Sequence, residues 1–389
     1  MANFIFSIPT QIQFGADISR QAGPVTKGLI DSREDASKKG ALVILDPGIK
    51  GNAWFKDILV CIQENDLQYQ TFDEVKPNPR DEDVYRAASV IKDNNFGAVI
   101  AVGGGSTIDT AKTAALLATH GGKVSDYAGW GKLPGPILPL VVIPTTAGSG
   151  SEATNWAVIT ESLSHSKVAI GDRYLAPLVA LVDPILTISL PSKLTAATGM
   201  DVLTHSIEAY LSALSSPVND LLALEAIRLV ATNLRQAVTR SDDMKAREAM
   251  MLASTLGGIV INNADVAGVH CLSESIGGHY DAPHGLLNAI LLPYFMMHWR
   301  KGCVVRFTHI AEAFGAGPRP DEAVNQVIGL NQFLKFPSLV EVGVKQQDLQ
   351  QLATTAASNV SNSSNPIPMT ASDYLLILEQ AMTGRISQA

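Results

Sequence analysis

The chain has 389 residues, of which 46% are hydrophobic and 17% charged. One hydrophobic core rarely organises a chain this long, so we expect two domains. The net charge of −8, without a Lys/Arg cluster, argues against a nucleic-acid partner. Three widely spaced cysteines predict no disulfide framework and fit a reducing compartment. The N-terminus lacks a basic, apolar leader and residues 286–297 are too short to span a membrane, so we expect a soluble, cytoplasmic protein without membrane association.

Strand and helix signals alternate over the first half of the chain. The charged stretch 31–40 predicts a solvated loop, and residues 81–92 predict a helix. Short apolar runs bounded by turn residues predict buried strands at residues 41–46, 98–102, 139–144 and 180–183. Such alternation predicts a parallel sheet covered by helices.

A glycine turn follows the second predicted strand. Gly103, Gly104 and Gly105 precede a helix that we expect to open at Ser106 or Thr107. Glycines let a phosphate approach the backbone, and a helix start offers unpaired amides and a favourable dipole. The run is not a GxGxxG fingerprint, so the ordinary dinucleotide motif does not apply, and the indication of a nucleotide site comes from its place between a strand and a helix.

Two further segments suit a nucleotide. Asp46 ends a predicted strand, where a carboxylate can accept from a ribose hydroxyl and favour NAD over NADP. The same Asp-Pro-Gly can equally be a simple turn. Residues 143–154, IPTTAGSGSEAT, are small and hydroxylated and offer donors for phosphate, ribose or nicotinamide.

Long helical stretches replace the strands from about residue 191. They include residues 220–240 and 246–261, whereas the Ser/Asn-rich residues 357–364 predict a loop. We place the domain boundary near 184–191, which gives an α/β domain over residues 1–187 and an all-helical domain over residues 188–389.

Four potential metal ligands lie in the second half. Asp201 and His205 are four residues apart, which on a helix places both side chains on one face. His270 opens a second helical run that we expect Pro283 to end, and His284 follows. One carboxylate with three imidazoles suits Fe(II) or Zn(II), and such an ion with an open position is a Lewis acid. The alternative is a set of core histidines.

Clustering favours the metal interpretation, because four of the eight histidines lie between His205 and His284. The remaining four have no partner at ligand spacing and are interpreted as structural or surface residues: His120, His165, His298 and His309. Cys271, beside His270, is expected to pack rather than to react.

The chain resembles the iron-containing (group III) alcohol dehydrogenases over nearly its whole length. The resemblance rests on five segments in the family's order and spacing: FGAVIAVGGGSTIDTAK, IPTTAGSGSEAT, ALVDPILTISLP, TGMDVLTHSIEAY and GGHYDAPHGLLNAILLP. It implies a Rossmann-like N-terminal nucleotide-binding domain, a helical metal-binding domain, an active site in the cleft between them, and a homodimer or larger homo-oligomer.

The resemblance also implies site residues. The metal ligands would be Asp201, His205, His270 and His284, and the pyrophosphate loop would be Gly103, Gly104, Gly105 and Ser106. Positions around the adenosine and nicotinamide would be Asp46, Asn78, Thr145, Thr146, Ser149, Lys167 and Leu186.

One position departs from the family pattern. Many members carry a second histidine four residues after the third ligand, where this chain has Glu274. Glu274 could accept a proton, pair with a cation, or orient a ligand imidazole. It would disfavour anionic substrates. His279, in the same segment, could relay a proton to solvent.

The expected reaction is reversible hydride transfer between a small primary alcohol or diol and NAD, assisted by Fe(2+) or Zn(2+). A glycerol dehydrogenase-like enzyme is one alternative. A lyase of the dehydroquinate synthase type is another, but it needs a Lys/Arg cluster that the metal region lacks. A nucleotide-binding protein without catalysis is disfavoured because the ligands and the glycine loop are intact.

Overall fold

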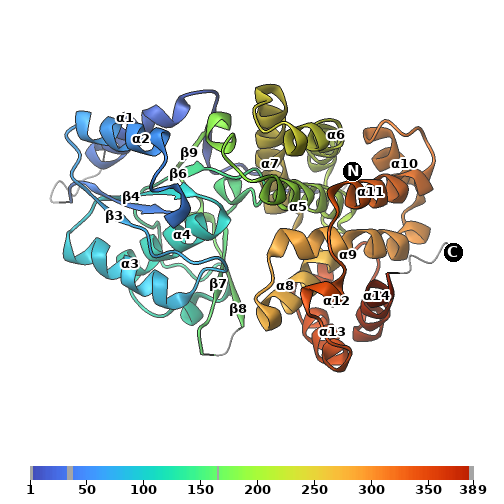
Figure 1. Ribbon diagram of the computed structural model, residues 1–389. Helices are drawn as coiled ribbons and strands as arrows, with labels where there is room; N and C mark the ends of the chain where they lie inside the picture. The colour runs from blue at the N-terminus through green and yellow to red at the C-terminus, as the bar shows by residue number, and fades with distance from the viewer. Residues whose placement is uncertain (1–2, 33–37, 164–165, 385–389) are drawn as a thin grey trace. The chain divides into compact units, whose positions relative to one another are not determined.

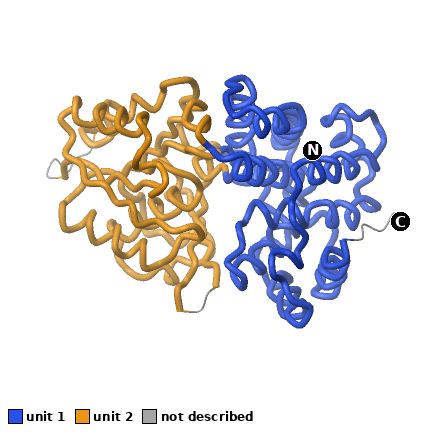
Figure 2. The backbone as a smooth tube through the Cα atoms, in the orientation of Figure 1, with its two compact units in different colours: residues 1–7, 147–149, 190–389 blue, residues 8–146, 150–189 orange. Residues whose placement is uncertain are grey.

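The computed structural model describes residues 3–32, 38–163 and 166–384, so His165 and part of the expected loop at 31–40 lie outside the described residues. The chain divides into two compact units (Figure 2). The α/β unit comprises residues 8–146 and 150–189. The helical unit comprises residues 190–389, the N-terminal segment up to Ser7, and Ala147–Ser149. The expected fold class, a parallel-sheet α/β domain followed by a helical domain, is confirmed.

A six-stranded parallel sheet forms the centre of the α/β unit, in the order β1-β9-β6-β4-β2-β3. Its strands are β1 Gln11–Phe14, β2 Ala41–Leu45, β3 Tyr69–Phe72, β4 Ala98–Gly103, β6 Leu140–Pro144 and β9 Val179–Val182. Every residue of β2, β4, β6 and β9 is buried. Because helices cover both faces, these strands are continuous apolar runs rather than alternating ones, which made them recognisable in the sequence.

The helices lie on both faces of this sheet (Figure 1). Helices α1 Ala22–Asp31 and α2 Ala53–Glu64 lie on one side, and α3 Asp81–Asp93 and α4 Gly105–His120 on the other. The strand order runs outward from β2 to β3 and in the opposite direction from β4 through β6 to β9. The direction therefore reverses between β2 and β4. In open α/β sheets, ligands bind beyond the carboxyl ends of the strands at this reversal.

A second, three-stranded sheet was not expected from the sequence. It consists of β5 Gly129–Trp130, β8 Lys167–Gly171 and β7 Trp156–Thr160, with β7 and β8 antiparallel. Gly171 lies beneath the Trp156 ring, where a Cβ atom would come within 2.6 Å of ring carbons. These strands are short and only partly buried, so they lack the apolar runs that identify the main sheet.

The helical unit contains helices and no strand among its described residues. Its helices are α5 Ser192–Leu211, α6 Pro217–Thr239, α7 Met244–Ala264, α8 Gly268–Tyr280, α9 His284–Trp299, α10 Val304–Ala313, α11 Pro320–Leu334, α12 Leu339–Val342, α13 Leu349–Ala357 and α14 Ala371–Thr383. Side-chain caps start the longest ones: Ser216 accepts from the Asn219 amide, and Asp243 from the Ala246 amide. Among the described helices, none is both long and apolar enough to cross a membrane.

Two expectations about this unit were wrong. Pro283 does not end α8, which stops at Tyr280 because Asp281 adopts a left-handed conformation (φ 52°); Pro283 instead precedes α9, which begins at His284. Residues 357–364 are not a simple loop, because Val360–Ser364 is a 3-10 helix. Ser364 is fully buried and donates to Asp265 (2.7 Å), which the Ser/Asn-rich composition did not indicate.

Candidate functional site

The four expected metal ligands meet in the helical unit. Asp201 and His205 lie one turn apart on α5, His270 lies in the first turn of α8, and His284 opens α9. Asp201 Oδ1 is 3.8 Å from His205 Nε2, 3.9 Å from His270 Nε2 and 3.8 Å from His284 Nε2. All four candidate ligand atoms lie within 4.8 Å of one another.

This arrangement fits a divalent ion. Ligand atoms about 2.1 Å from a tetrahedral ion are about 3.4 Å apart. The separations between Asp201 and the imidazoles, 3.8–3.9 Å, would shorten by about 0.5 Å around such an ion, and the widest separation in the set, up to 4.8 Å, by up to about 1.4 Å. The side chains of Asp201, His205 and His270 are at most 7% exposed, whereas that of His284 is 38% exposed. Solvent therefore reaches the donor set from the His284 side.

Glu208 orients one of the ligands, and the sequence analysis missed it. It lies on α5, is fully buried, accepts from the Val269 amide (2.6 Å), and pairs with His270 Nδ1. A proton held at Nδ1 leaves the Nε2 lone pair of His270 free for a metal, and such carboxylate partners are common around metal-bound histidines. The signal was a glutamate three residues after His205, a spacing that places both side chains on one face of a helix.

Two side chains hold the first turn of α8, which carries His270. Glu208 accepts from the Val269 amide, and the Asn365 side chain accepts from the Gly268 amide (3.0 Å). Backbone amides of a first helical turn have no partner within the helix, so these two acceptors satisfy them. The 3-10 segment before Asn365 thus helps to position a candidate ligand from the far end of the chain.

Burial and charge set the protonation of the ligands. Burial lowers the pKa of His205 to about 4, so its imidazole is neutral near pH 7. For Asp201, burial raises the pKa, but the surrounding imidazoles and the Asn288 amide outweigh it and lower the pKa overall. For His270, burial acts to lower the pKa, but the Glu208 carboxylate outweighs it and raises the pKa. A metal at His270 would compete with a proton, so its binding should weaken in acid.

The two candidate catalytic residues, Glu274 and His279, lie at different places along α8. Glu274 is partly buried, one turn after His270 on α8, and its carboxylate accepts from Asn359 Nδ2 (2.8 Å). Its negative charge acts on His270. His279 is exposed at the end of α8, meets the Tyr280 ring edge-on, and lies 3.9 Å from Asp348. His279 is not one of the four candidate metal ligands, and its role as a proton relay stays a prediction.

The expected nucleotide residues gather at the carboxyl edge of the main sheet. Asp46 follows β2 and its amide bonds to Val102 of β4; the Thr145 amide, after β6, bonds to the Gly103 carbonyl (3.0 Å). Gly103 permits a close turn, because a Cβ there would lie 2.4 Å from Thr107 Oγ1. Helix α4 begins at Gly105, so its amino end opens at the point where the sheet order reverses.

Asp46 makes the turn that its sequence context suggested. Its Oδ1 accepts from the Gly48 amide (2.7 Å) and caps a short 3-10 helix. This contact accounts for the Asp-Pro-Gly sequence and leaves recognition of a ribose by Asp46 as a prediction.

The other expected cofactor residues are more dispersed. Asn78, in a left-handed conformation, accepts from Lys167 Nζ (3.0 Å), so these two meet. A Cβ on Gly104 would lie 3.1 Å from Thr146 Oγ1, which places Thr146 beside the glycine turn. Leu186 is 2% exposed and packs in the core of the main sheet. Ser149 is partly buried in the segment assigned to the helical unit.

A buried network ties α4 to the segment that follows Ser149. Lys112 is fully buried and donates to Thr154 O (2.9 Å), Trp156 O (2.7 Å) and Ser151 Oγ (3.1 Å). Asp109, one turn earlier, accepts from Ser151 Oγ (2.5 Å) and the Val158 amide. Burial lowers the pKa of Lys112 to about 8. The sequence analysis missed this support of the helix behind the glycine turn.

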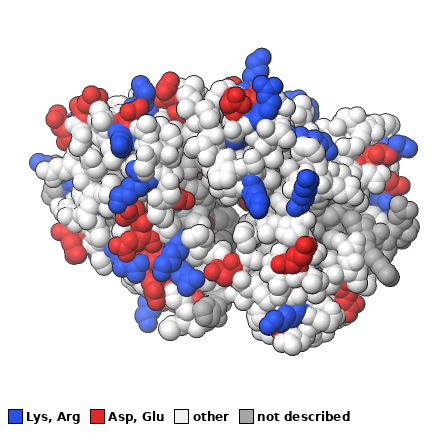
Figure 3. All heavy atoms as spheres, in the orientation of Figure 1, with Lys and Arg blue, Asp and Glu red and all other residues white. Residues whose placement is uncertain are grey.

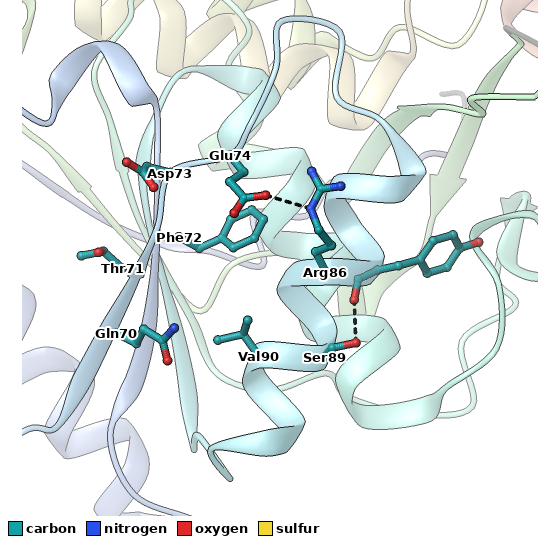
Figure 4. Close-up of a pocket in the computed structure, with 9 residues that line it drawn as sticks. Gln70, Thr71, Phe72, Asp73, Glu74, Arg86, Ser89 and Val90 are labelled. Carbon is teal, nitrogen blue, oxygen red and sulfur yellow. Dashed lines mark hydrogen bonds and ion pairs between the residues drawn. The ribbon is translucent and has the colours of Figure 1, made fainter.

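A hollow of about 420 Å³ lies away from these residues, between β3 and α3 (Figure 4). Glu74 and Arg86 on its wall pair with each other (2.9 Å), and Ser89 donates to the Tyr85 carbonyl (3.0 Å). None of the expected site residues lines it. On the face shown in Figure 3, acidic and basic side chains are interspersed without a broad basic patch among the described residues.

Comparison with known proteins identifies the family. The model of the iron-containing alcohol dehydrogenases matches residues 9–184, and the model of the C-terminal domain of the same family matches residues 195–382. This chain is a member of the iron-containing alcohol dehydrogenase family. The resemblance stated from the sequence is thereby confirmed.

Relatives within the iron-containing alcohol dehydrogenases cover almost the full chain. The NAD-dependent methanol dehydrogenase of Bacillus methanolicus is 35% identical over 98% of this chain and 100% of its own. The 1,3-propanediol dehydrogenase of Klebsiella pneumoniae is 36% identical over 88% of this chain and 91% of its own. A crystal structure of a 1,3-propanediol oxidoreductase is 34% identical, with a TM-score of 0.93 over 98% of this chain and 100% of that one.

Proposed function

We propose that this protein is an NAD- and divalent metal-dependent alcohol dehydrogenase that interconverts small primary alcohols or diols and their aldehydes. The observation that carries the proposal is the buried set of Asp201, His205, His270 and His284, with Glu208 holding the His270 tautomer. Membership of the family and the names of the methanol and 1,3-propanediol dehydrogenases support the same reaction class.

The proposed metal site uses Asp201 and the Nε2 atoms of the three histidines. A divalent ion there would supply Lewis acidity towards an alcohol oxygen, and NAD would supply the hydride acceptor. Three of the four ligand side chains are buried, so an alcohol would reach the site beside the partly exposed His284. The Glu274 charge would favour neutral or cationic alcohols over anionic ones.

The proposed nucleotide site lies at the carboxyl edge of the main sheet. The amino end of α4, at Gly103–Ser106, would bind the pyrophosphate through backbone amides and the helix dipole. Asp46 would accept from the adenosine ribose and disfavour a 2′-phosphate. Asn78, Lys167 and the hydroxyls of Thr145 and Thr146 would contact the rest of the cofactor. Ser149 and Leu186 are included from the family pattern alone.

The proposal is tested by removing and restoring the metal. Protein stripped with a chelator should lose activity, and reloading with Fe(II) or Zn(II) should restore NADH formation from methanol, ethanol or 1,3-propanediol. Aldehyde reduction should reappear in parallel. Stoichiometric metal binding without turnover of any alcohol or aldehyde, with either NAD or NADP, would contradict the proposal.

Location and assembly are separate proposals. We expect a cytoplasmic homodimer or larger homo-oligomer, as the family pattern implies. Light scattering on the purified protein would give its assembly state, and the mass of a single chain would contradict the expected homo-oligomer.

A further inference from the structure

Asn288 contacts three of the four candidate metal-ligand atoms. It is fully buried on α9, one turn after His284. Its Nδ2 lies 2.7 Å from Asp201 Oδ1, 3.1 Å from His270 Nε2 and 3.1 Å from His284 Nε2. Its own Oδ1 is buried without a hydrogen-bond partner among the described residues. The NH2 group of Asn288 therefore faces the candidate metal-ligand atoms, and the carbonyl oxygen of the same side chain is left without a hydrogen bond.

The contacted atoms are the ones that would bind the metal. In the neutral tautomer that donates from Nδ1 to Glu208, His270 offers the lone pair of Nε2 to the amide. An imidazole nitrogen has only one lone pair, which can accept an N–H or bind a cation, but not both. A carboxylate oxygen has two, so Asp201 can keep the Asn288 bond while it binds a metal.

We propose that the Asn288 amide competes with the metal for the lone pairs of His270 and His284, and so lowers metal affinity and keeps the metal exchangeable. The inference rests on the proposed metal site. Contacts that exist before a ligand binds, and are lost when it binds, subtract from its affinity. Glu208 has the opposite effect, because it bonds to His270 at the nitrogen that does not face the metal.

The test is the metal affinity of Asn288→Leu, which keeps the size of the side chain and removes its N–H groups. Full-length protein is stripped with a chelator and titrated with Zn(II) and Co(II) against a competing chelator. We expect the Kd to fall about tenfold, and metal release to slow, because loss of the competing contacts is worth about one net hydrogen bond.

A matched control is available in the same unit. Asn219 on α6 is also fully buried, and its Oδ1 has no hydrogen-bond partner in the part of the chain that the structure describes. Its Nδ2 lies near Ser215 (3.5 Å) rather than near the candidate metal ligands. Asn219→Leu should leave the metal Kd unchanged. Asn288→Ala, a second variant in case the leucine form does not fold, should tighten binding in the same direction.

The outcomes separate this inference from the proposed function. An unchanged or weaker metal Kd in a folded Asn288 variant would overturn the competition. Equal tightening in Asn219→Leu would also overturn it, because the effect would then not come from the donor contacts. A wild-type protein that binds no metal would overturn the metal site itself, and this inference with it.

Discussion

Replacing Glu208 by glutamine should weaken metal binding by changing the tautomer of His270. The carboxylate accepts from both the Val269 amide and His270 Nδ1. Glutamine has one oxygen and one NH2 group. The backbone amide of Val269 can only donate, so the oxygen would face it and the NH2 group would face Nδ1. His270 would then carry its proton on Nε2, where it cannot bind a metal.

The size of the effect follows from these contacts. Loss of a partner that orients a metal-bound histidine typically weakens metal binding by about 10- to 100-fold. This corresponds to about 1.4–2.7 kcal/mol. The free energy of unfolding of the metal-depleted protein should fall by about 1–3 kcal/mol as well, because hydrogen bonds to a charged, buried carboxylate are lost.

The assay is a Zn(II) titration of Glu208→Gln, with circular dichroism to verify the fold. Asp265→Asn is a matched control, because this carboxylate lies just before α8 and accepts from Ser361 and Ser364, and it is not one of the four candidate metal ligands found among the described residues. Asp265 has a positive φ (64°), and asparagine, like aspartate, adopts positive φ more readily than most other residues. A wild-type metal Kd in Glu208→Gln, or an equal loss in Asp265→Asn, would refute the tautomer argument.

Three further predictions concern cofactor choice, Glu274 and pH. Asp46→Ser keeps an oxygen that can cap the Gly48 amide and removes the negative carboxylate, so the NADPH/NADH ratio of kcat/KM should rise about tenfold (about 1.4 kcal/mol). An unchanged ratio means that Asp46 only makes the turn. Glu274→Gln keeps an acceptor for Asn359 but removes the negative charge, so we expect turnover to fall while the metal content stays the same. Wild-type turnover in this variant would mean that Glu274 serves only to hold Asn359. Burial lowers the pKa of Lys112 from 10.5 to about 8, so between about pH 8 and 10.5 the unfolded chain holds a proton that the folded one has lost. Wild-type stability relative to Lys112→Met, measured by urea unfolding, should therefore rise with pH in this window; a flat difference would contradict a desolvated ammonium.

Much of the main sheet could be predicted because its strands are buried on both faces. Strands β2, β4, β6 and β9 are continuous apolar runs bounded by turn residues. Their alternation with helices indicates parallel pairing. The order of the strands, and the reversal between β2 and β4, depend on crossover connections that no local pattern records. The small sheet was missed because its strands are short and partly exposed.

The sequence by itself determined the types of metal donor and the register of one pair. Asp201 and His205 share a face of α5 because of helical periodicity alone. The meeting of α5 with α8 and α9 was decided by tertiary packing, which brought His270 and His284 to that face. The same packing directed Glu208 and Asn288 at the candidate metal-ligand atoms, although nothing in the local sequence distinguishes either residue from the other polar residues of its helix. Periodicity records which face a residue occupies, whereas contacts between helices depend on side chains that are distant along the chain.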